Sequence, residues 1–327
     1  MIVETKEKDM KKILVVMPVD EVQRNRFHNI DENLDFLFLP VHDVTEQMIN
    51  EANVIVGNIP SSMIHEPPNL DLMQLNSAGA DEYVKAGVLS NRTILTSANG
   101  AYNKTVAEHA FALSLALMKN LQLYRDNQRN HFWHDVGAAQ SFENANVVIV
   151  GCGNIGVHFA KYVKAFGAHT IGIKKRVGEI PEGIDELYTT NRLAEILPTS
   201  DIVVSFLPQT EDTIKIFDAD FFSSMKDSAI FVNCGRGSSV DYDALEYALT
   251  NNQISAAAID VCDIEPLSID SSLWEISNLL ISPHVAGGYH LADTKDRIVD
   301  IAVYNIKQYL NEKEYINIID RKTGYKI

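Results

Sequence analysis

Short apolar runs alternate with longer stretches of helical periodicity along most of this chain. Most runs end in turn-forming residues and are apolar on both faces, as expected for strands that helices cover on each side. The runs occupy residues 12–18, 53–58, 72–79, 146–151, 169–174, 201–208, 229–235, 255–262 and 278–284. This alternation predicts an α/β protein with parallel sheets and crossover helices.

Two helical stretches suggest how the chain is divided. Residues 103–124 are predicted to form one long apolar helix lodged between two domains. Towards the C-terminal end, apolar residues recur at helical spacing and form a stripe that must dock on another surface. We therefore predict one domain at 101–289 and a second domain made of residues 1–100 plus 290–327. The stripe consists of Ile298, Ile301, Ala302, Ile306, Tyr309 and Leu310.

Composition and charge exclude several classes of protein. The chain has 327 residues, with 28 Lys and Arg against 44 Asp and Glu, giving a formal net charge of −16. Such a balance disfavours a nucleic-acid partner, which basic patches would bind. The charged start, MIVETKEKDMKK, predicts no secretory signal, and no apolar run reaches the roughly 18 residues of a membrane span. The cysteines Cys152, Cys234 and Cys262 stand singly, which predicts a cytoplasmic protein without disulfides or bound metal.

A glycine fingerprint, GCGNIG, leaves one predicted strand and opens a helix. In this context Gly151 permits the tight turn, Gly153 lets the backbone approach a pyrophosphate, and Gly156 lets helix and strand pack closely. The helix N-terminus then offers free N–H groups to the phosphates. The motif predicts a dinucleotide cofactor.

The end of the next predicted strand carries three cations, Lys174, Lys175 and Arg176, and no carboxylate occurs before Glu179. Proteins specific for NAD place an acid here to bind the ribose 2′-hydroxyl, whereas cations attract a 2′-phosphate. The stretch therefore predicts a preference for NADP, with NAD as the second option. The alternative interpretation is a solvated basic turn.

Three later strand ends carry groups suited to the chemistry of keto and hydroxy acids. Arg236 follows one strand in NCGRGSSVD, and its planar fork suits a carboxylate. Asp260, Asp263 and Glu265 follow the next, and His284 follows the last in SPHVAGG. Taken singly, the arginine could be a surface residue, the histidine a packing group and Glu265 part of a turn.

Together these motifs resemble the D-isomer-specific 2-hydroxyacid dehydrogenases over nearly the whole chain, most closely the glyoxylate/hydroxypyruvate reductases. The matching segments are NSAGAD (76–81), VAEHAFAL (106–113), GCGNIG (151–156), LPQTEDT (207–213), NCGRGSSVD (233–241), AAAIDVCDIEP (256–266) and SPHVAGG (282–288). The resemblance implies a Rossmann-type doubly wound sheet inserted into a smaller, flavodoxin-like α/β substrate domain.

The resemblance also implies the roles of the catalytic residues. His284 would be the general acid in keto-acid reduction and the base in the reverse reaction, with Glu265 pairing with it to stabilise its protonated form. Arg236 would bind the substrate carboxylate and polarise the keto oxygen. The backbone N–H groups of Ala78 and Gly79 would grip the same carboxylate from the other domain.

Further residues are implied to contact the cofactor. They are Asp260 at the nicotinamide carboxamide, the Cys234 backbone in the same pocket, Asn154 and Ile155 over the pyrophosphate, Leu207 and Pro208 beside the adenine, and Thr105. In related reductases the segment around Trp133 helps to build a homodimer and can reach the neighbouring active site; simple interface packing is the alternative. For His109 we predict packing and no catalytic role.

The leading prediction is a reductase that transfers a hydride to C2 of a small 2-keto acid, giving the D-2-hydroxy acid. Short D-3-phosphoglycerate or D-lactate-type dehydrogenases are alternatives, and the end of the chain at residue 327 without a regulatory domain weakens the first. A formate-dehydrogenase-like enzyme would pair its histidine with an amide, which Glu265 contradicts. A corepressor-like, dinucleotide-sensing interaction protein with vestigial activity is the alternative from another class.

Overall fold

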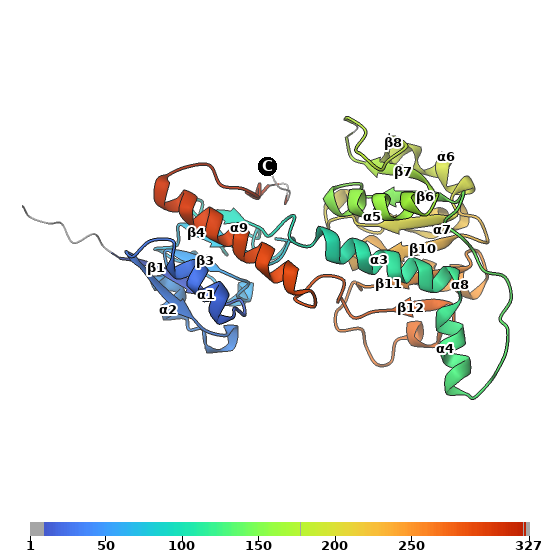
Figure 1. Cartoon of the computed structure of the whole chain (residues 1–327), viewed down its shortest axis with the longest axis horizontal. Helices are drawn as coiled ribbons and strands as arrows, with labels where there is room; N and C mark the ends of the chain where they lie inside the picture. The colour runs from blue at the N-terminus through green and yellow to red at the C-terminus, as the bar shows by residue number, and fades with distance from the viewer. Residues whose placement is uncertain (1–9, 177, 323, 325–327) are drawn as a thin grey trace, which may run out of the picture. The chain divides into compact units, whose positions relative to one another are not determined.

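The computed structural model describes residues 10–176, 178–322 and 324. Residues 1–9, which bear on the prediction that the chain has no secretory signal, lie outside the described residues. The chain divides into two compact units, each with its own parallel sheet (Figure 1). Unit 1 comprises Met1–Ala101 and Leu291–Ile327, and unit 2 comprises Tyr102–His290. Unit 2 is thus an insertion in the sequence of unit 1.

Unit 1 contains a five-stranded sheet in the order β2-β1-β3-β4-β5, with every neighbouring pair parallel. This is the flavodoxin-like order, and it confirms the predicted fold class. Its strands are β1 (Lys11–Val15), β2 (Leu34–Phe38), β3 (Val54–Val56), β4 (Leu72–Gln74) and β5 (Ile94–Thr96). Its helices are α1 (Glu21–His28), α2 (Glu46–Glu51) and α9 (Ala292–Asn311), with short 3₁₀ turns η1 (Val41–Asp43) and η2 (Ser61–Met63).

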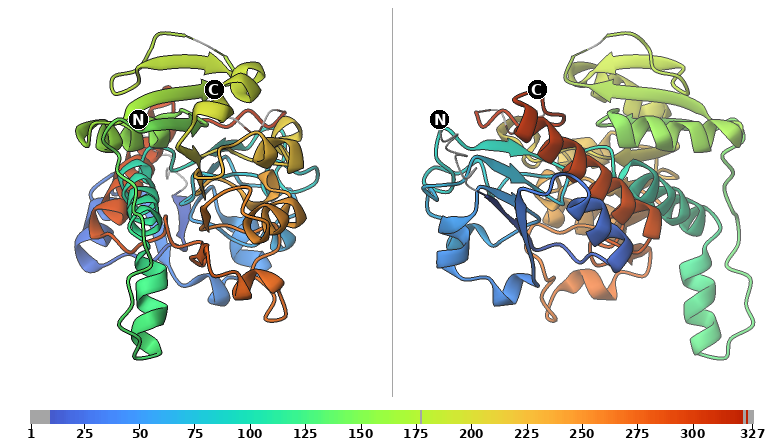
Figure 2. Two further views of the ribbon diagram at one scale, coloured as in Figure 1. Left: turned by 90° about the vertical axis from the view of Figure 1, so that its right-hand side faces the viewer. Right: turned by 60° about the vertical axis from the view of Figure 1, so that its left-hand side comes forward.

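The last helix, α9, completes unit 1 although nearly two hundred residues separate it from β5, the preceding strand of that unit. It packs beside α1 (Figure 2), where Gln23 Nε2 donates to Asp296 Oδ1 over 2.8 Å. Ile298, Ala302 and Ile306 of the predicted apolar stripe are buried. The stripe therefore docks within unit 1.

Unit 2 contains a seven-stranded sheet in the order β12-β11-β10-β9-β6-β7-β8, again entirely parallel. The order reverses between β6 and β9, as in a doubly wound dinucleotide-binding sheet, and this confirms the predicted class. The strands are β6 (Asn146–Val150), β7 (His169–Lys174), β8 (Glu186–Thr189), β9 (Ile202–Ser205), β10 (Ile230–Asn233), β11 (Ala256–Ile259) and β12 (Leu279–Ile281). The helices are α3 (Asn103–Met118), α4 (Leu121–Arg129), α5 (Asn154–Ala165), α6 (Leu193–Ile196), α7 (Ala219–Ser223) and α8 (Tyr242–Thr250), with 3₁₀ turns η3 (Thr190–Arg192), η4 (Leu197–Thr199), η5 (Glu211–Thr213), η6 (Gly237–Ser239) and η7 (Ser272–Glu275).

The single helix predicted at 103–124 is wrong. Asn120 has a φ of +55°, which interrupts the helix between α3 and α4. Asparagine tolerates this left-handed conformation better than most residues, because its short polar side chain bonds locally. Here its Nδ2 donates to the carbonyl oxygen of Ala138 over 3.0 Å. As a result α3 packs on α5 and on β10 and β11, while α4 projects from unit 2 with residues 130–140 running back beside it (Figure 2).

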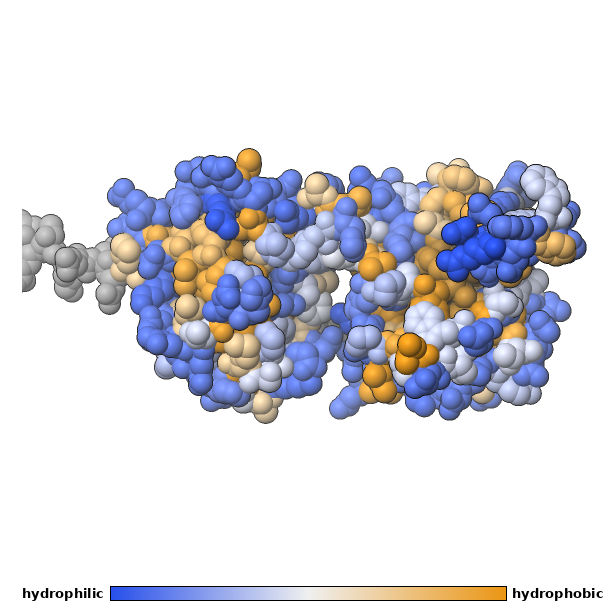
Figure 3. Space-filling view, turned by 90° about the horizontal axis from the view of Figure 1, so that it is seen from below, coloured by the Kyte–Doolittle hydropathy of each residue, from blue (hydrophilic) through white to orange (hydrophobic). Residues whose placement is uncertain are grey.

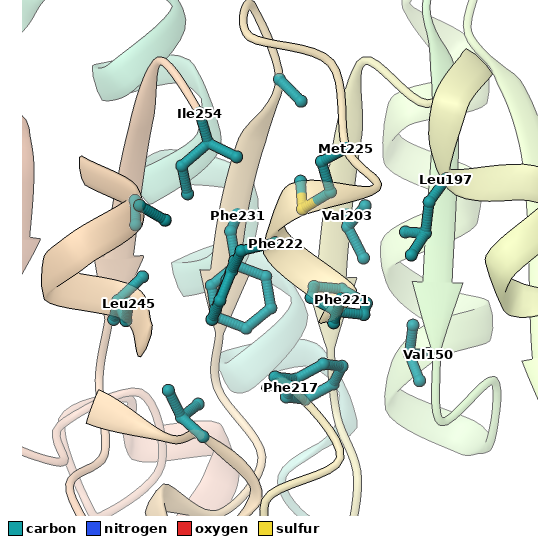
Figure 4. Packing of buried hydrophobic residues seen from close by; sticks show 14 of the residues in the cluster. Val150, Leu197, Val203, Phe217, Phe221, Phe222, Met225, Phe231, Leu245 and Ile254 are labelled. Atoms are coloured by element: carbon teal, nitrogen blue, oxygen red, sulfur yellow. The ribbon is translucent and has the colours of Figure 1, made fainter. Parts of the chain in front are cut away.

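Aromatic packing supports one face of the sheet in unit 2 (Figure 4). Phe217, Phe221, Phe222 and Phe231 contact one another edge-on, with ring centroids 4.8–5.9 Å apart. Such offset contacts suit the ring quadrupoles and add to the free energy of burial. The cluster packs Phe231 of β10 against Phe217 and against the two phenylalanines of α7.

The surface mixes polar and apolar side chains, and the face in Figure 3 shows both kinds interspersed in each unit. Such scattered apolar residues are ordinary on a protein surface. Within the ranges that the structure describes, none of the helices combines the length and the apolar character needed to cross a bilayer.

Candidate active site

The loops that follow β9, β10 and β11 touch through their backbones at the carboxyl edge of the sheet in unit 2. A Cβ placed on Gly235 would lie 2.6 Å from Leu207 N, and one on Gly237 would lie 1.9 Å from the carbonyl carbon of Cys262. Real Cβ contacts are never this short, so both positions require glycine. The two glycines bring three predicted strand-end motifs into one cluster.

The glycine fingerprint lies at the carboxyl end of β6, at the point where the strand order reverses. Gly151 has a φ of +85°, and a Cβ on it would lie 2.8 Å from the backbone of Phe206; a Cβ on Gly156 would lie 2.9 Å from Ile149 Cγ2. These two glycines are needed for the fold itself. Gly153 differs, since its nearest neighbour would be 4.0 Å away. It is exposed in front of the N-terminus of α5, and this open cradle fits a pyrophosphate.

The three cations lie at the end of β7, next to β6 in the sheet. Lys174 is the last residue of the strand and is partly exposed, and Arg176 is exposed. Lys175 Nζ lies 2.6 Å from Oδ2 of Asp212, which belongs to η5 in the loop after β9. Asp212 is not predicted from the sequence, because this contact joins loops that follow different strands.

Arg236 sits in a turn that the preceding asparagine shapes. Asn233 Oδ1 accepts from the N–H of Gly235 over 3.0 Å, and its Nδ2 donates to the carbonyl oxygen of Arg236 over 3.1 Å. Ser239 Oγ donates to the same carbonyl over 2.6 Å. The Arg236 backbone is therefore fixed on both sides. The guanidinium Nη1 donates to the carbonyl oxygen of Gly235 over 3.0 Å.

His284 and Glu265 lie together as predicted, with His284 Nδ1 2.7 Å from Glu265 Oε2. The other oxygen, Oε1, accepts from the backbone N–H of Cys262 over 2.9 Å, so the carboxylate is held at both ends. A carboxylate at Nδ1 selects the tautomer with its proton there and orients the ring. Nε2 has no hydrogen-bond partner in the described part of the chain, and the His284 side chain is 51% exposed. The ring is thus anchored at one nitrogen and open at the other.

Asp260 organises the loop that carries His284. Its side chain is 1% exposed; Oδ1 accepts from Ser282 Oγ at 2.6 Å and from the N–H of Val285 at 3.0 Å, and Oδ2 accepts from the N–H of Ala286 at 2.9 Å. Burial acts to raise the pKa of Asp260, but hydrogen bonds, first from His109 and Ser282, outweigh it and leave the pKa below its ordinary value. The charged carboxylate therefore clamps the His284 loop.

His109 contributes to this clamp, in contrast to the packing role predicted for it. Its Nε2 lies 3.0 Å from Ser282 Oγ and 3.4 Å from Asp260 Oδ1. The histidine comes from α3 and the serine follows β12, 173 positions later in the chain. Only the VAEH segment hinted at a polar group on this apolar helix, so its partner could not be found from sequence.

The other residues predicted to bind the cofactor lie around the same edge of unit 2. Cys234 is buried, its N–H donates to the Ser205 carbonyl over 3.0 Å, and burial raises the pKa of its thiol well above the ordinary value. Its side chain is therefore a neutral packing group. Asn154 and Pro208 are exposed, Ile155 and Leu207 are half-buried, and Thr105 is buried on α3.

Ala78 and Gly79 belong to unit 1, in the loop after β4. Ser77 Oγ donates to the Gly79 carbonyl oxygen over 2.7 Å and accepts from Asn58 Nδ2 over 2.9 Å, which braces the turn. Among the described residues, none accepts a hydrogen bond from the N–H of Ala78 or of Gly79. The two donors remain available to an anion.

The described residues bring no three His, Cys, Asp or Glu side chains together in an arrangement that could hold a metal ion. The charged and polar groups of the site are instead those of acid–base chemistry and carboxylate recognition.

Comparison with known proteins identifies the chain. The family described as D-isomer specific 2-hydroxyacid dehydrogenase, NAD binding domain, matches residues 111–286, more than half of the chain. The chain is similar to a probable 2-ketogluconate reductase of Dictyostelium discoideum, with 31% identity over 83% of this chain and 84% of the relative. It is also similar to glyoxylate/hydroxypyruvate reductase B of Shigella dysenteriae, with 28% identity over 93% of this chain and 95% of the relative.

A solved structure shows the same architecture. The D-isomer specific 2-hydroxyacid dehydrogenase of Xanthobacter autotrophicus, in complex with NADPH and MES, superposes with a TM-score of 0.81 at 25% identity, covering 97% of this chain and all of that chain. The sheet order, the glycine fingerprint and the match of sequence agree. The chain is an enzyme and belongs to the D-isomer specific 2-hydroxyacid dehydrogenase family.

Proposed function

We propose that the enzyme reduces a small 2-keto acid of the glyoxylate or hydroxypyruvate type to the D-2-hydroxy acid, with NADPH preferred over NADH. The observation that carries the proposal is the His284–Glu265 pair, 2.7 Å apart, on the same sheet edge as the glycine fingerprint. The reductase named among its relatives supports the substrate class.

When bound, a dinucleotide would supply the hydride for C2 of the substrate. His284 donates a proton from Nε2 to the keto oxygen as negative charge develops there, and takes it back in the reverse reaction. Glu265 stabilises the imidazolium before the transfer and keeps Nε2 turned outward. Arg236 binds the substrate carboxylate and draws electron density from the keto oxygen.

We propose the following contacts with the substrate and the cofactor. In unit 1, the N–H groups of Ala78 and Gly79 bind the substrate carboxylate. In unit 2, Asp260 contacts the nicotinamide carboxamide in addition to clamping the His284 loop. The remaining cofactor contacts that we propose are Gly151, Gly153, Asn154, Ile155, Gly156, Leu207, Pro208, Thr105 and the backbone of Cys234.

The choice of cofactor rests on Lys174, Lys175 and Arg176. No carboxylate stands at the end of β7 to bind a ribose 2′-hydroxyl, and three cations there favour a 2′-phosphate. The Xanthobacter relative, which shares the fold, was solved with NADPH. Both observations favour NADPH.

Changing Lys174 and Arg176 together to Met is expected to raise KM for NADPH by about tenfold or more, since a hydrogen bond to a charged group contributes about 1.5–3 kcal/mol. KM for NADH should change far less, because NADH lacks the phosphate. Steady-state kinetics with glyoxylate, hydroxypyruvate and a bulkier 2-keto acid measure both values.

Lys307→Met, on the exposed side of α9, is the matched control and should leave both KM values within about twofold. An unchanged ratio of the two KM values in the double variant would mean that the basic turn is only solvated. Dinucleotide binding without turnover of any keto acid would instead favour an interaction protein.

We also propose that the enzyme is a cytoplasmic homodimer built through α4 and residues 130–140. Trp133 is fully exposed on this arm, beside a groove of about 700 Å³, and Tyr124 Oη donates to Asp135 to hold the return segment. Light scattering after size-exclusion chromatography is expected to give a dimer, and Trp133→Asp should shift it towards monomer. A wild-type protein that is monomeric at micromolar concentration would contradict the assignment.

A further inference from the structure

The ion pair between Lys175 and Asp212 connects the two loops on either side of the glycine fingerprint. In the sheet order β9-β6-β7, the fingerprint follows β6, Lys175 follows β7, and Asp212 lies in η5 after β9. The pair, 2.6 Å between Nζ and Oδ2, therefore passes across the carboxyl end of β6. The adenosine end of a dinucleotide bound to the fingerprint has to lie near this bridge.

The loop that carries Asp212 is braced independently of Lys175. Thr213 Oγ1 donates to the Pro208 carbonyl oxygen over 2.8 Å and accepts from the N–H of Thr210 over 2.8 Å. Asp212 is therefore held on a short, hydrogen-bonded turn, whereas Lys175 reaches it with a flexible side chain. When the pair opens, the carboxylate stays near the site and the ammonium moves.

The pair is weak enough to open. The side chains of Lys175 and Asp212 are 65% and 69% exposed, and ion pairs at such exposure contribute little to stability because water and salt screen them. A 2′-phosphate carries about two negative charges near neutral pH and binds an ammonium more strongly than a single carboxylate does. The 2′-phosphate can therefore displace the Asp212 carboxylate from Lys175. The displaced carboxylate stays close and repels the phosphate.

We propose that Asp212 is a specificity-determining residue that competes with the 2′-phosphate of NADP for Lys175 and so limits the preference for NADP over NAD. This inference rests on the proposed role of the cations after β7. NAD has no 2′-phosphate, so its binding does not require the pair to open. The competition thus acts on one cofactor only and keeps NAD usable.

The test is direct binding of NADP⁺ and of NAD⁺ to the full-length enzyme by titration calorimetry, independent of turnover. Asp212→Asn should lower Kd for NADP⁺ about three- to tenfold, and the ratio of the two Kd values should shift by the same factor. In the Lys175→Met background, Asp212→Asn should have little effect on Kd for NADP⁺, because the ammonium for which Asp212 and the 2′-phosphate compete is then missing. Adenosine 2′,5′-bisphosphate, which lacks the nicotinamide half, should show the same pattern.

Glu211→Gln is the matched control. Glu211 is exposed in the same turn and, among the described residues, makes no ion pair, so its removal changes the net charge equally while leaving the Lys175 bridge intact. An equal effect of both variants would overturn the proposal in favour of general electrostatics. Tighter NAD⁺ binding to wild type than to Asp212→Asn would overturn it too, since Asp212 would then hold the ribose hydroxyl.

Different results would contradict the role of Asp212 and the proposed preference for NADP. If Lys174→Met with Arg176→Met removes the NADP⁺ preference while Asp212→Asn has no effect, only the role of Asp212 is wrong. If wild type binds both dinucleotides equally and no variant changes their ratio, the assignment of the cations to a 2′-phosphate is wrong as well.

Discussion

Replacing His284 by Asn is expected to lower kcat by about 10²- to 10⁴-fold, the usual contribution of a positioned general acid–base group. His284 has a φ of +53°, a left-handed conformation that asparagine tolerates better than most residues. The variant therefore removes the titrating ring without straining the loop that Asp260 clamps. Kd for the dinucleotide should remain within a few-fold of wild type, because the loss concerns proton transfer.

Steady-state kinetics and dinucleotide titration of His284→Asn separate these two quantities. His42→Asn is the control, since His42 is exposed in unit 1 and is not among the predicted site residues. It should retain full activity. If His284→Asn kept more than about a tenth of the wild-type kcat, another group would have to supply the proton.

Replacing Gly237 by Ala is expected to lower the free energy of unfolding by about 3 kcal/mol or more, within the range known for severe overpacking and backbone strain. The added Cβ would lie 1.9 Å from the Cys262 carbonyl carbon and 2.0 Å from its oxygen. Both are backbone atoms, so no side-chain rotation relieves the clash. The loops after β10 and β11 would have to separate, displacing Arg236 and Glu265 together.

Urea unfolding followed by circular dichroism measures this change, and activity should fall with it. Gly178→Ala is the matched control, because a Cβ there meets no atom within 4 Å. Its free energy of unfolding should stay within about 1 kcal/mol of wild type. A Gly237→Ala enzyme as stable as this control would show that the two loops are not in rigid contact.

The strands that could be predicted from the sequence are those with a clear hydrophobic pattern. Central strands buried on both faces are continuous apolar runs, and all the strands flanked on both sides in unit 2 were predicted. The strands β2, β5 and β8 were missed; each lies at the edge of its sheet. Edge strands expose one side, and β2 in fact alternates buried and exposed positions. Apart from the run 169–174, which matches β7 residue for residue, each apolar run was longer than its strand, because buried residues continue into the loops of the carboxyl edge.

The residues of the candidate site could be predicted where they belong to contiguous sequence motifs. The pairing of His284 with Glu265 followed from the resemblance, and the structure brings the two together. The bond from His109 to Ser282 was not predictable, since it depends on how α3 packs across the sheet. The contact between Lys175 and Asp212 was not predictable either, since it depends on which strands are neighbours in the sheet. Contacts between side chains from distant elements require the three-dimensional order of the strands.

The insertion of unit 2 into unit 1 has a consequence for how the chain is made. The ribosome completes Tyr102–His290 as one uninterrupted segment, so unit 2 has all the strands of its sheet before α9 of unit 1 is made. Unit 1 lacks α9 until Ala292–Asn311 has been synthesised, so the surface that Ile298, Ala302 and Ile306 cover stays open until then. Because domains generally fold as units, the segment synthesised first is the last to reach its native core.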